Sequence, residues 1–298
     1  MDILFNIFSK VWENTEKSDA KIHAKQVKPE GIDEENNFPY IDDKNPYHLL
    51  DVYYPENTEG KLPVIIDIHG GGWMYADKDL NKFYCLSLAK RGFCVFNISY
   101  PLVPDVRVRD QLKDISKALK WIGDNIDSFP ADKNNIMLTG DSAGGQLAAY
   151  SAVINESAFL KQHFSTVDTG LKFTALTLTS PVAYMNTSLP MGAYCRKMWD
   201  EKPFRVSTTP YLNLDEIIDL ASLPPTLFVT SSGDFLALKQ TKKAYELFLS
   251  KGIDATLLNF PKFEGKHLPH VFGVLEPESK AGKIYIDKMC EFFRNTIK

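Results

Sequence analysis

The stretch that decides the fold of this chain is Ile136-Met137-Leu138-Thr139-Gly140-Asp141-Ser142-Ala143-Gly144-Gly145-Gln146-Leu147. The apolar run at its start predicts a buried strand, and the residues after Gly145 predict a helix. Gly140 and Gly144 flank the serine at the turn, because bulky neighbours there would collide with the strand and the helix. The pattern therefore predicts a strained Ser142 at a helix N-terminus, where developing negative charge is favoured.

A second glycine-rich turn lies upstream, directly after the strand-like run at 63–68, and has the sequence His69-Gly70-Gly71-Gly72-Trp73. When a serine hydroxyl attacks an ester carbonyl, negative charge develops on the carbonyl oxygen, and each preorganised N–H aimed at that oxygen is worth ~3–4 kcal/mol. Glycine presents its N–H without a side chain that blocks close approach. We therefore predict oxyanion-hole donors at Gly71, at Gly72 and at Ala143, the residue after the serine.

These two turns resemble the nucleophile elbow and the oxyanion-hole loop of α/β-hydrolases, whose triad follows the chain order serine, acid, histidine. The histidine takes the serine proton, and the carboxylate holds the histidine tautomer. Asp234 follows the strand-like run at 227–230 and is the predicted acid. Its alternative role, the N-cap of the next helix, is compatible with catalysis. Asp215 and Asp219 lie in a long insertion and are weaker candidates.

Only three histidines follow Ser142, namely His163, His267 and His270. His163 precedes the predicted acid in a polar connection, which is too early in this chain order. The base is therefore expected after the last long strand, where His270 is preferred and His267 is the alternative. The spacing of these two also fits a metal-binding pair, but no third ligand is evident and Pro269 opposes a helix, so we predict no metal.

The rest of the chain alternates between strand-like and helical patterns, which predicts one α/β domain with a mostly parallel sheet covered by helices. Strands are expected at 48–54, 64–69, 93–99, 135–139, 173–180, 226–231 and 256–260, and helices near 79–91, 107–127, 143–155, 236–251 and 278–296. We assign the catalytic domain to 46–180 and 224–298. Residues 1–45 are expected to form one or two helices and a connection, without a core of their own.

The segment 181–223 interrupts this alternation. It carries methionines and aromatic residues among prolines and charges: Met185, Met191, Tyr194, Met198, Trp199, Phe204 and Tyr211. A connection of about two to six residues would suffice between a strand and a helix. The segment is therefore expected to be an insertion that forms a cap over the site and shapes an acyl pocket, rather than an excursion packed on itself.

Composition limits the other classes of function. The 298 residues carry a net charge of −4 without a basic block, which argues against nucleic-acid binding. No stretch reaches the ~20 apolar residues of a membrane span, and the short apolar N-terminus lacks the basic start and cleavage site of a signal peptide. The four cysteines are far apart and are expected to be buried thiols. We therefore expect a cytoplasmic protein that acts on a small-molecule ester, with homodimer formation left open.

Four motifs together resemble the hormone-sensitive-lipase-like family of α/β-hydrolases, the bacterial HGGG carboxylesterases, over residues 48–296. They are the turn at 69–73, the elbow at 140–145, Asp234 ahead of an apolar pair, and the segment 270–272. The last is similar to the family's His-Xaa-Phe site, which favours His270 over His267. The resemblance implies a cap built from N-terminal helices and an insertion, and hydrolysis of short to medium acyl esters without a cofactor.

The sequence therefore predicts a serine carboxylesterase or lipase-like hydrolase that forms an acyl-enzyme on Ser142. Two alternatives stay open. The same machinery could remove acetyl groups from sugars, because fold and triad alone do not fix the substrate. The second alternative is a ligand receptor that kept the fold but lost turnover. The plant gibberellin receptors of this family, however, lack the catalytic histidine, which this chain retains.

Overall fold

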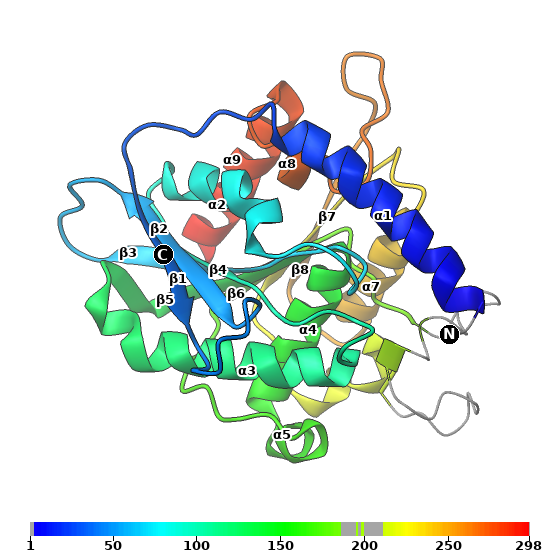
Figure 1. The fold of residues 1–298 in the computed structure, drawn as a ribbon, viewed down its shortest axis with the longest axis horizontal. Coiled ribbons are helices and arrows are strands. Elements are labelled where there is room, and N and C mark those ends of the chain that lie inside the picture. Colours follow the sequence, from blue (N-terminus) through cyan, green and yellow to red (C-terminus); the bar gives the residue numbers. More distant parts are fainter. Residues whose placement is uncertain (1–2, 186–194, 196–197, 200–210, 298) are drawn as a thin grey trace.

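The computed structural model describes residues 3–185, 195, 198–199 and 211–297. These residues form an eight-stranded sheet in the order β1-β2-β4-β3-β5-β6-β7-β8 (Figure 1). β1 and β2 run antiparallel to their neighbours, and the other strands pair in parallel. With helices on both faces of this sheet, the chain has the α/β-hydrolase fold that the sequence predicts.

The elements have the following bounds. The strands are β1 Ile32–Pro39, β2 Leu49–Pro55, β3 Leu62–Ile68, β4 Cys94–Ile98, β5 Ala131–Asp141, β6 Ala175–Thr179, β7 Thr226–Ser231 and β8 Ala255–Phe260. The helices are α1 Ile3–His23, α2 Lys82–Ala89, α3 Val108–Asn125, α4 Ser142–Glu156, α5 Ala158–Phe164, α7 Leu238–Ser250, α8 Phe272–Leu275 and α9 Lys280–Thr296. Short 3₁₀ turns are η1 Lys78–Asn81, η2 Ile126–Ser128, η3 Leu214–Glu216 and η4 Ile218–Leu220.

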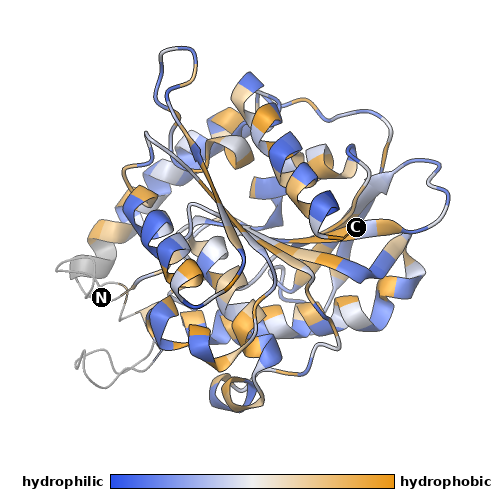
Figure 2. Ribbon diagram, turned by 180° about the vertical axis from the view of Figure 1, so that it is seen from behind, coloured by the Kyte–Doolittle hydropathy of each residue, from blue (hydrophilic) through white to orange (hydrophobic). Residues whose placement is uncertain are grey.

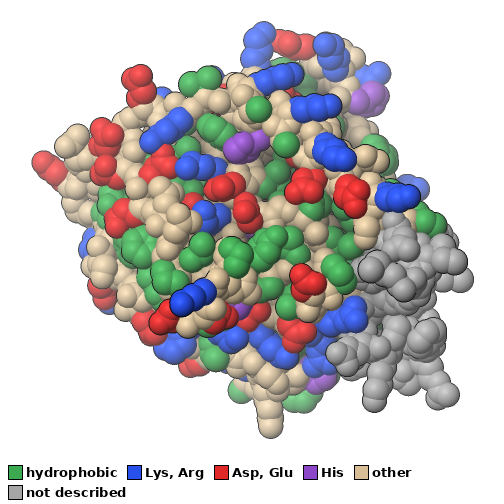
Figure 3. Space-filling view, in the orientation of Figure 1, with side chains coloured by type: hydrophobic (Ala, Val, Ile, Leu, Met, Phe, Trp, Pro, Cys, Tyr) green, Lys and Arg blue, Asp and Glu red, His purple; other side chains and the backbone are tan. Residues whose placement is uncertain are grey.

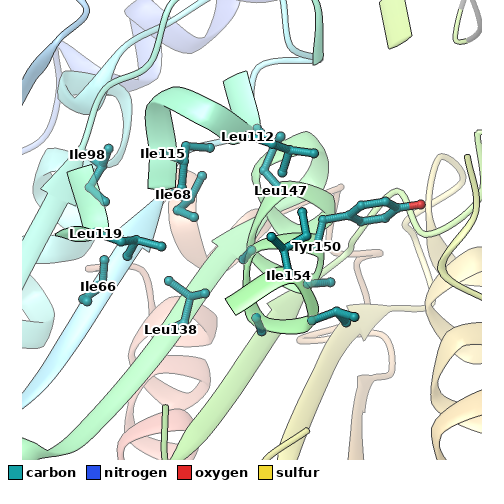
Figure 4. Close-up of a cluster of buried hydrophobic side chains, with 14 of the residues drawn as sticks. Ile66, Ile68, Ile98, Leu112, Ile115, Leu119, Leu138, Leu147, Tyr150 and Ile154 are labelled. Carbon is teal, nitrogen blue, oxygen red and sulfur yellow. The ribbon is translucent and has the colours of Figure 1, made fainter. Parts of the chain in front are cut away.

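Two apolar layers hold the helices against the sheet. Successive residues of β3 point to opposite faces, so Ile66 and Ile68 join one layer and Ile65 joins the other. Figure 4 shows the first layer, in which side chains of β3, β4 and β5 meet Leu112 and Ile115 of α3 and residues of α4. α5 and α7 pack on the same face, whereas α2, α8 and α9 cover the other. The apolar colour along the central strands in Figure 2 fits a sheet buried on both faces.

The parallel strands end at the same edge of the sheet, which is where ligands of such sheets bind. The loops that leave β3, β5, β7 and β8 start at this edge. They contain the glycine turn at 69–73, Ser142, Asp234 and His270. The topology therefore brings every part of the predicted site to one end of the sheet.

The N-terminal segment differs from the sequence expectation. It forms one helix, α1, and then β1, a strand that the sequence pattern does not predict. β1 pairs antiparallel with β2 at the edge of the sheet, and most of its residues are partly or fully exposed. Such an edge strand needs no alternation of apolar and polar residues. Because it contains acidic residues such as Glu34 and Glu35, its sequence does not have the pattern by which strands are predicted. The short helices α5 and α8 are also absent from the sequence prediction.

The predicted insertion at 181–223 falls partly outside the described residues, which omit 186–194, 196–197 and 200–210. Met185, Met198 and Trp199 are described and buried in the apolar layer on the α4 side of the sheet. The Trp199 ring meets the Tyr150 ring of α4 edge to face, with 5.4 Å between the centroids. The other predicted pocket residues at 191, 194 and 204 lie outside the described residues.

The surface and the cysteines agree with the composition. Both signs of charge are interspersed on the face that Figure 3 shows. No described helix has the length and apolar character that crossing a bilayer requires. All four cysteines are free and buried, as the sequence predicts.

Candidate active site

Ser142 lies where β5 ends and α4 begins, at the sharp turn that the sequence predicts. Its φ angle is 53°, in the left-handed region that is costly for a residue with a side chain. The positions that flank Ser142 must be glycine, because there is no room for a Cβ atom at either of them. A Cβ on Gly140 would lie 2.6 Å from the carbonyl carbon of Gly144, and a Cβ on Gly144 would lie 2.5 Å from that of His69. The elbow therefore holds Ser142 in strained backbone, directly against the loop after β3.

Three side chains form a hydrogen-bonded chain at this edge of the sheet. In the tautomer that carries its proton on Nδ1, His270 donates to Asp234 Oδ1 over 2.9 Å. The same ring accepts the Ser142 hydroxyl at Nε2 over 2.9 Å. Asp234 comes from the turn after β7, and His270 comes from the loop between β8 and α8. Both distances are within the range that proton transfer requires.

Donors surround the Asp234 carboxylate, whose side chain has 0% exposed surface. Its Oδ1 accepts the N–H groups of Leu236 and Ala237 over 3.1 and 2.9 Å, which caps the turn that leads into α7. Burial alone would raise its pKa. The hydrogen bond and charge of His270, with bonds from Ser180 and Ala237, nevertheless hold the pKa of Asp234 below its ordinary value. Asp234 is therefore ionised at neutral pH and can fix the histidine tautomer.

The other candidates from the sequence lie apart from this chain of hydrogen bonds. His267 is exposed, and its Nδ1 lies 3.4 Å from Ser232 Oγ. His163 belongs to α5 rather than to an open connection, which corrects the sequence expectation. Asp219 forms an exposed ion pair with Lys251. Among the described residues, no group of three or more His, Cys, Asp or Glu side chains could hold a metal ion.

The loop after β3 has an unusual backbone. Gly71, Gly72 and Trp73 have φ angles of 103°, 57° and 65°, a conformation that glycine adopts at low cost. The Gly71 carbonyl accepts the N–H groups of Met74 and Tyr75 over 3.0 and 3.1 Å, so the loop closes into a compact turn. The predicted donors at Gly71 and Gly72 thus lie in a fixed turn beside the elbow.

His69 holds this loop in place and stays neutral. The buried ring donates from Nδ1 to the Gly70 carbonyl over 2.8 Å and stacks on Tyr100 with 4.3 Å between the centroids. The Tyr100 hydroxyl also donates to the His69 carbonyl over 2.6 Å. Burial lowers the pKa of His69 to about 4, so the ring carries no charge at neutral pH.

Two glutamines that sequence reasoning missed fix the far end of the loop. Gln146 of α4 accepts the indole N–H of Trp73 over 3.2 Å. Gln111 of α3 donates to the Trp73 carbonyl over 3.0 Å. Both side chains are buried. An amide directly after the elbow glycines, at the start of a mostly apolar helix, is a signal that could have identified Gln146.

α1 lies against the same loop. Trp12 packs so closely on Gly72 that a Cβ there would lie 2.5 Å from the indole ring. Trp12 also stacks on Tyr75 with 5.7 Å between the centroids, and the Tyr75 hydroxyl donates to Asp19 over 2.8 Å. The sequence predicts a helix in this segment but does not indicate which of its residues reach the site.

The sheet order and the hydrogen-bonded serine, histidine and aspartate define an α/β-hydrolase with a serine-hydrolase site. A family model described as BD-FAE matches residues 50–188. A crystal structure of inhibited esterase B from Lactobacillus rhamnosis is 30% identical and has a TM-score of 0.92, covering 99% of this chain and 97% of that one. The chain belongs to the hormone-sensitive-lipase-like family of carboxylesterases within the α/β-hydrolases.

Curated relatives match over shorter stretches. Versiconal hemiacetal acetate esterase of Dothistroma septosporum is 38% identical over 98 residues, which are 33% of this chain and 30% of that protein. Esterase LipC of Mycobacterium tuberculosis is 34% identical over 116 residues, which are 38% of this chain and 28% of that protein. Each match therefore spans less than a third of the length of the relative.

Proposed function

We propose that the protein is a serine carboxylesterase that cleaves short to medium acyl esters through an acyl-enzyme on Ser142. The observation that carries this proposal is the hydrogen-bonded chain from Ser142 Oγ through His270 to Asp234, with 2.9 Å at each step. A serine hydroxyl becomes a useful nucleophile only when such a base is in reach and is itself oriented.

In the first half of the reaction, Ser142 Oγ attacks the ester carbonyl carbon while its proton moves to His270 Nε2. The carbonyl oxygen becomes an oxyanion, which the N–H groups of Gly71, Gly72 and Ala143 stabilise. The tetrahedral intermediate collapses when His270 gives its proton to the leaving alcohol. Water then attacks the acyl-enzyme by the same route, and the acid product leaves with Ser142 restored.

The relatives support the chemistry and the size of the substrate. A second crystal structure of esterase B from Lactobacillus rhamnosis, inhibited by a C4-C4 tributyrin phosphonate, is 31% identical and has a TM-score of 0.92. That inhibitor resembles a glycerol ester of a short acid. For the present chain we infer an acyl group of similar length. No feature of the described site favours the sugar-ester deacetylase or the receptor over this function.

We further propose that α1 and the insertion at 181–223 together form a cap over the site. The packing of Trp12 on Gly72 and the bond from Tyr75 to Asp19 support the part played by α1. A cap of this kind would exclude water from the oxyanion during reaction. The division into a cap segment at 1–45, a cap insertion at 181–223 and a catalytic domain remains part of this proposal.

We also infer a cytoplasmic location and a small-molecule ester as the partner. The four cysteines are free and buried, which is compatible with a reducing compartment. Homodimer formation stays a prediction for solution measurements.

The test is the hydrolysis of p-nitrophenyl esters from acetate to palmitate by the wild type and by Ser142→Ala, His270→Ala and His267→Ala. We expect cleavage of the short esters by the wild type and by His267→Ala, and loss of at least ~10³-fold in kcat for the other two variants. If His267→Ala alone loses activity, the base is His267. If Ser142→Ala retains normal turnover, the proposal is wrong.

A further inference from the structure

Asp141 joins the two halves of the site, although the reaction described above does not use its side chain. Its backbone leads directly into Ser142, and its Oδ1 accepts the N–H of Gly70 over 3.0 Å. Gly70 has no free space on this side, because a Cβ would overlap Asp141 Oδ2 and lie 2.9 Å from the Asp141 carbonyl oxygen. One residue therefore fixes the start of the loop after β3 (residues 69–77, the oxyanion loop) relative to the nucleophile.

Asn81 of η1 links Asp141 to a second carboxyl group. Its Nδ2 donates to Asp141 Oδ1 over 2.9 Å and to Asp67 Oδ2 over 2.8 Å. Asp67 lies in a row of buried polar residues that crosses the sheet at one register, beside Asn97 of β4 and Thr139 of β5. Buried polar groups in such a sheet need partners, and both hydrogens of the Asn81 amide are used here.

The two bridged carboxyl groups are both buried, and burial raises the pKa of each. Burial, with the nearby charge of Asp141, raises the pKa of Asp67 well above its ordinary value, which favours the protonated form of Asp67. Burial also raises the pKa of Asp141, to about 6, although the bond from Asn81, the charge of His270 and the Gly70 N–H oppose that rise. Asp141 is therefore the ionised member of the pair above about pH 6.

The titratable groups that face Asp141 come from several elements. They are Asp19 of α1, Asp67 of β3, Tyr75 of the oxyanion loop, Cys85 of α2, Tyr100 after β4, His270 after β8 and Tyr285 of α9. Burial raises the pKa of the three phenols and of the thiol, so these four groups stay neutral around pH 6 to 8. Within this cluster, the pKa of Asp141, about 6, lies close to neutral pH.

We propose that Asp141 is a positioning residue: its ionised carboxylate, oriented by Asn81 and Asp67, holds Gly70 and so aligns the oxyanion donors with Ser142. This inference rests on the proposed esterase function. A charge-assisted hydrogen bond is roughly twice as strong as a neutral one, so protonation of Asp141 loosens the loop. Through space, the charge favours the His270 imidazolium and disfavours the oxyanion, and these two effects oppose one another. The hydrogen bond to Gly70 is the interaction by which Asp141 acts on the position of the loop itself.

The test compares kcat and KM for p-nitrophenyl butyrate between about pH 4.5 and 8.5 in the wild type and in Asp141→Asn. We expect a wild-type to variant ratio of kcat of about tenfold at ~pH 8, falling towards one below ~pH 5, because the wild type then also lacks the charge. The midpoint of this change should lie near 6. KM should change by less than about twofold, because the interaction matters in the transition state.

Asp124→Asn is the matched control, because it removes the same charge from a side chain of α3 that is 59% exposed. Its ratio to the wild type should stay near one at every pH. Asn81→Ala is a second, independent variant that keeps Asp141. It removes a bond that favours the ionised form, so its activity should change with pH at a midpoint above that of the wild type.

Three results would overturn the inference while leaving the esterase intact. The first is a wild-type to Asp141→Asn ratio of kcat that does not depend on pH. The second is a pH midpoint of kcat for Asn81→Ala that equals that of the wild type. The third is a ratio of kcat that depends on pH for Asp67→Asn but not for Asp141→Asn. These results are distinguishable from a failure of the proposed esterase function. In that case the wild type would lack esterase activity, or Ser142→Ala would retain it.

Discussion

The loops that carry Asp234 and His270 meet the oxyanion loop at Ser142, and each of these two regions contains a buried carboxylate. Asp234 accepts two backbone N–H groups and the His270 ring, and its pKa is lowered. Asp141 accepts one backbone N–H and one amide, and its pKa is raised to about 6. Burial penalises both charges, so the difference comes from the donors. A buried carboxylate stays ionised where a histidine and several N–H groups face it, and it titrates where they are fewer.

Removing the charge from the triad region should have the largest effect. In Asp234→Asn the shape is kept, but the amide no longer holds the His270 tautomer that accepts the serine proton. We expect kcat to fall by ~10³–10⁴-fold. Initial rates on p-nitrophenyl butyrate measure this loss. Asp219→Asn, in the exposed pair with Lys251, is the matched control and should stay within about twofold of the wild type. A near-normal rate for Asp234→Asn would assign the acid to another residue.

Displacing the oxyanion loop should cause the second-largest loss of kcat. Gly70→Ala pushes a methyl group into the Asp141 carboxylate and shifts the loop away from Ser142. We expect kcat to fall by ~10²-fold, which is the effect of losing about one oxyanion donor, with a much smaller change in KM. Steady-state kinetics test this, and circular dichroism verifies that the variant is folded. A loss of only a few fold would show that this contact does not fix the loop.

The two carboxylates should affect stability in opposite directions as the pH changes. The lowered pKa of Asp234 contributes stability above its ordinary pKa, and this contribution is lost as the pH falls through the folded value. The raised pKa of Asp141 contributes stability below about pH 4, and this is lost as the pH rises through about 6. Asp141→Asn should therefore raise the free energy of unfolding at ~pH 8 by ~2–3 kcal/mol, and by little at ~pH 4.

Urea unfolding at both pH values measures this difference, with Asp124→Asn as the surface control. If Asp141→Asn instead lowers the free energy of unfolding at ~pH 8, the donors around Asp141 stabilise its charge as fully as the donors around Asp234 stabilise that of Asp234. The contrast between the two regions would then be wrong.

The smallest effect is expected from α1. Trp12→Ala uncovers Gly72 and removes the stack on Tyr75, so the oxyanion loop gains freedom. We expect kcat/KM for p-nitrophenyl butyrate to fall by roughly threefold to fivefold. The neighbouring Val11, a residue that is 49% exposed, provides the control in Val11→Ala. Equal values of kcat/KM for both variants would show that the packing of α1 does not affect the function of the oxyanion loop.

The chemistry of this site could be predicted from sequence because each part of it is local. The elbow around Ser142 and the glycine turn at 69–73 are contiguous, and their composition follows from the close approach of backbones. The fold and the family predicted from these motifs are confirmed. Asp234 and His270 follow from chain order, and the structure places both within hydrogen-bond distance of their partners.

The supporting contacts could not be predicted in the same way. Asn81 lies in a short polar turn, and nothing in that turn indicates two buried carboxyl groups as its partners. Asp67, in contrast, is a single charged residue in an otherwise apolar strand, and this pattern does indicate a buried polar contact. The contact between Trp12 and Gly72 depends on how a whole helix docks, and helical periodicity does not encode that.

One long-range contact bears on the order in which the chain becomes active during synthesis. The Gln26 amide, just after α1, donates to the Leu275 carbonyl over 2.6 Å, across a separation of 249 residues. The contact between the end of α1 and α8 can therefore form only after α8 has been synthesised. His270 emerges at almost the same moment. A nascent chain should thus carry its elbow without its base until the segment that contains His270 and α8 has been synthesised.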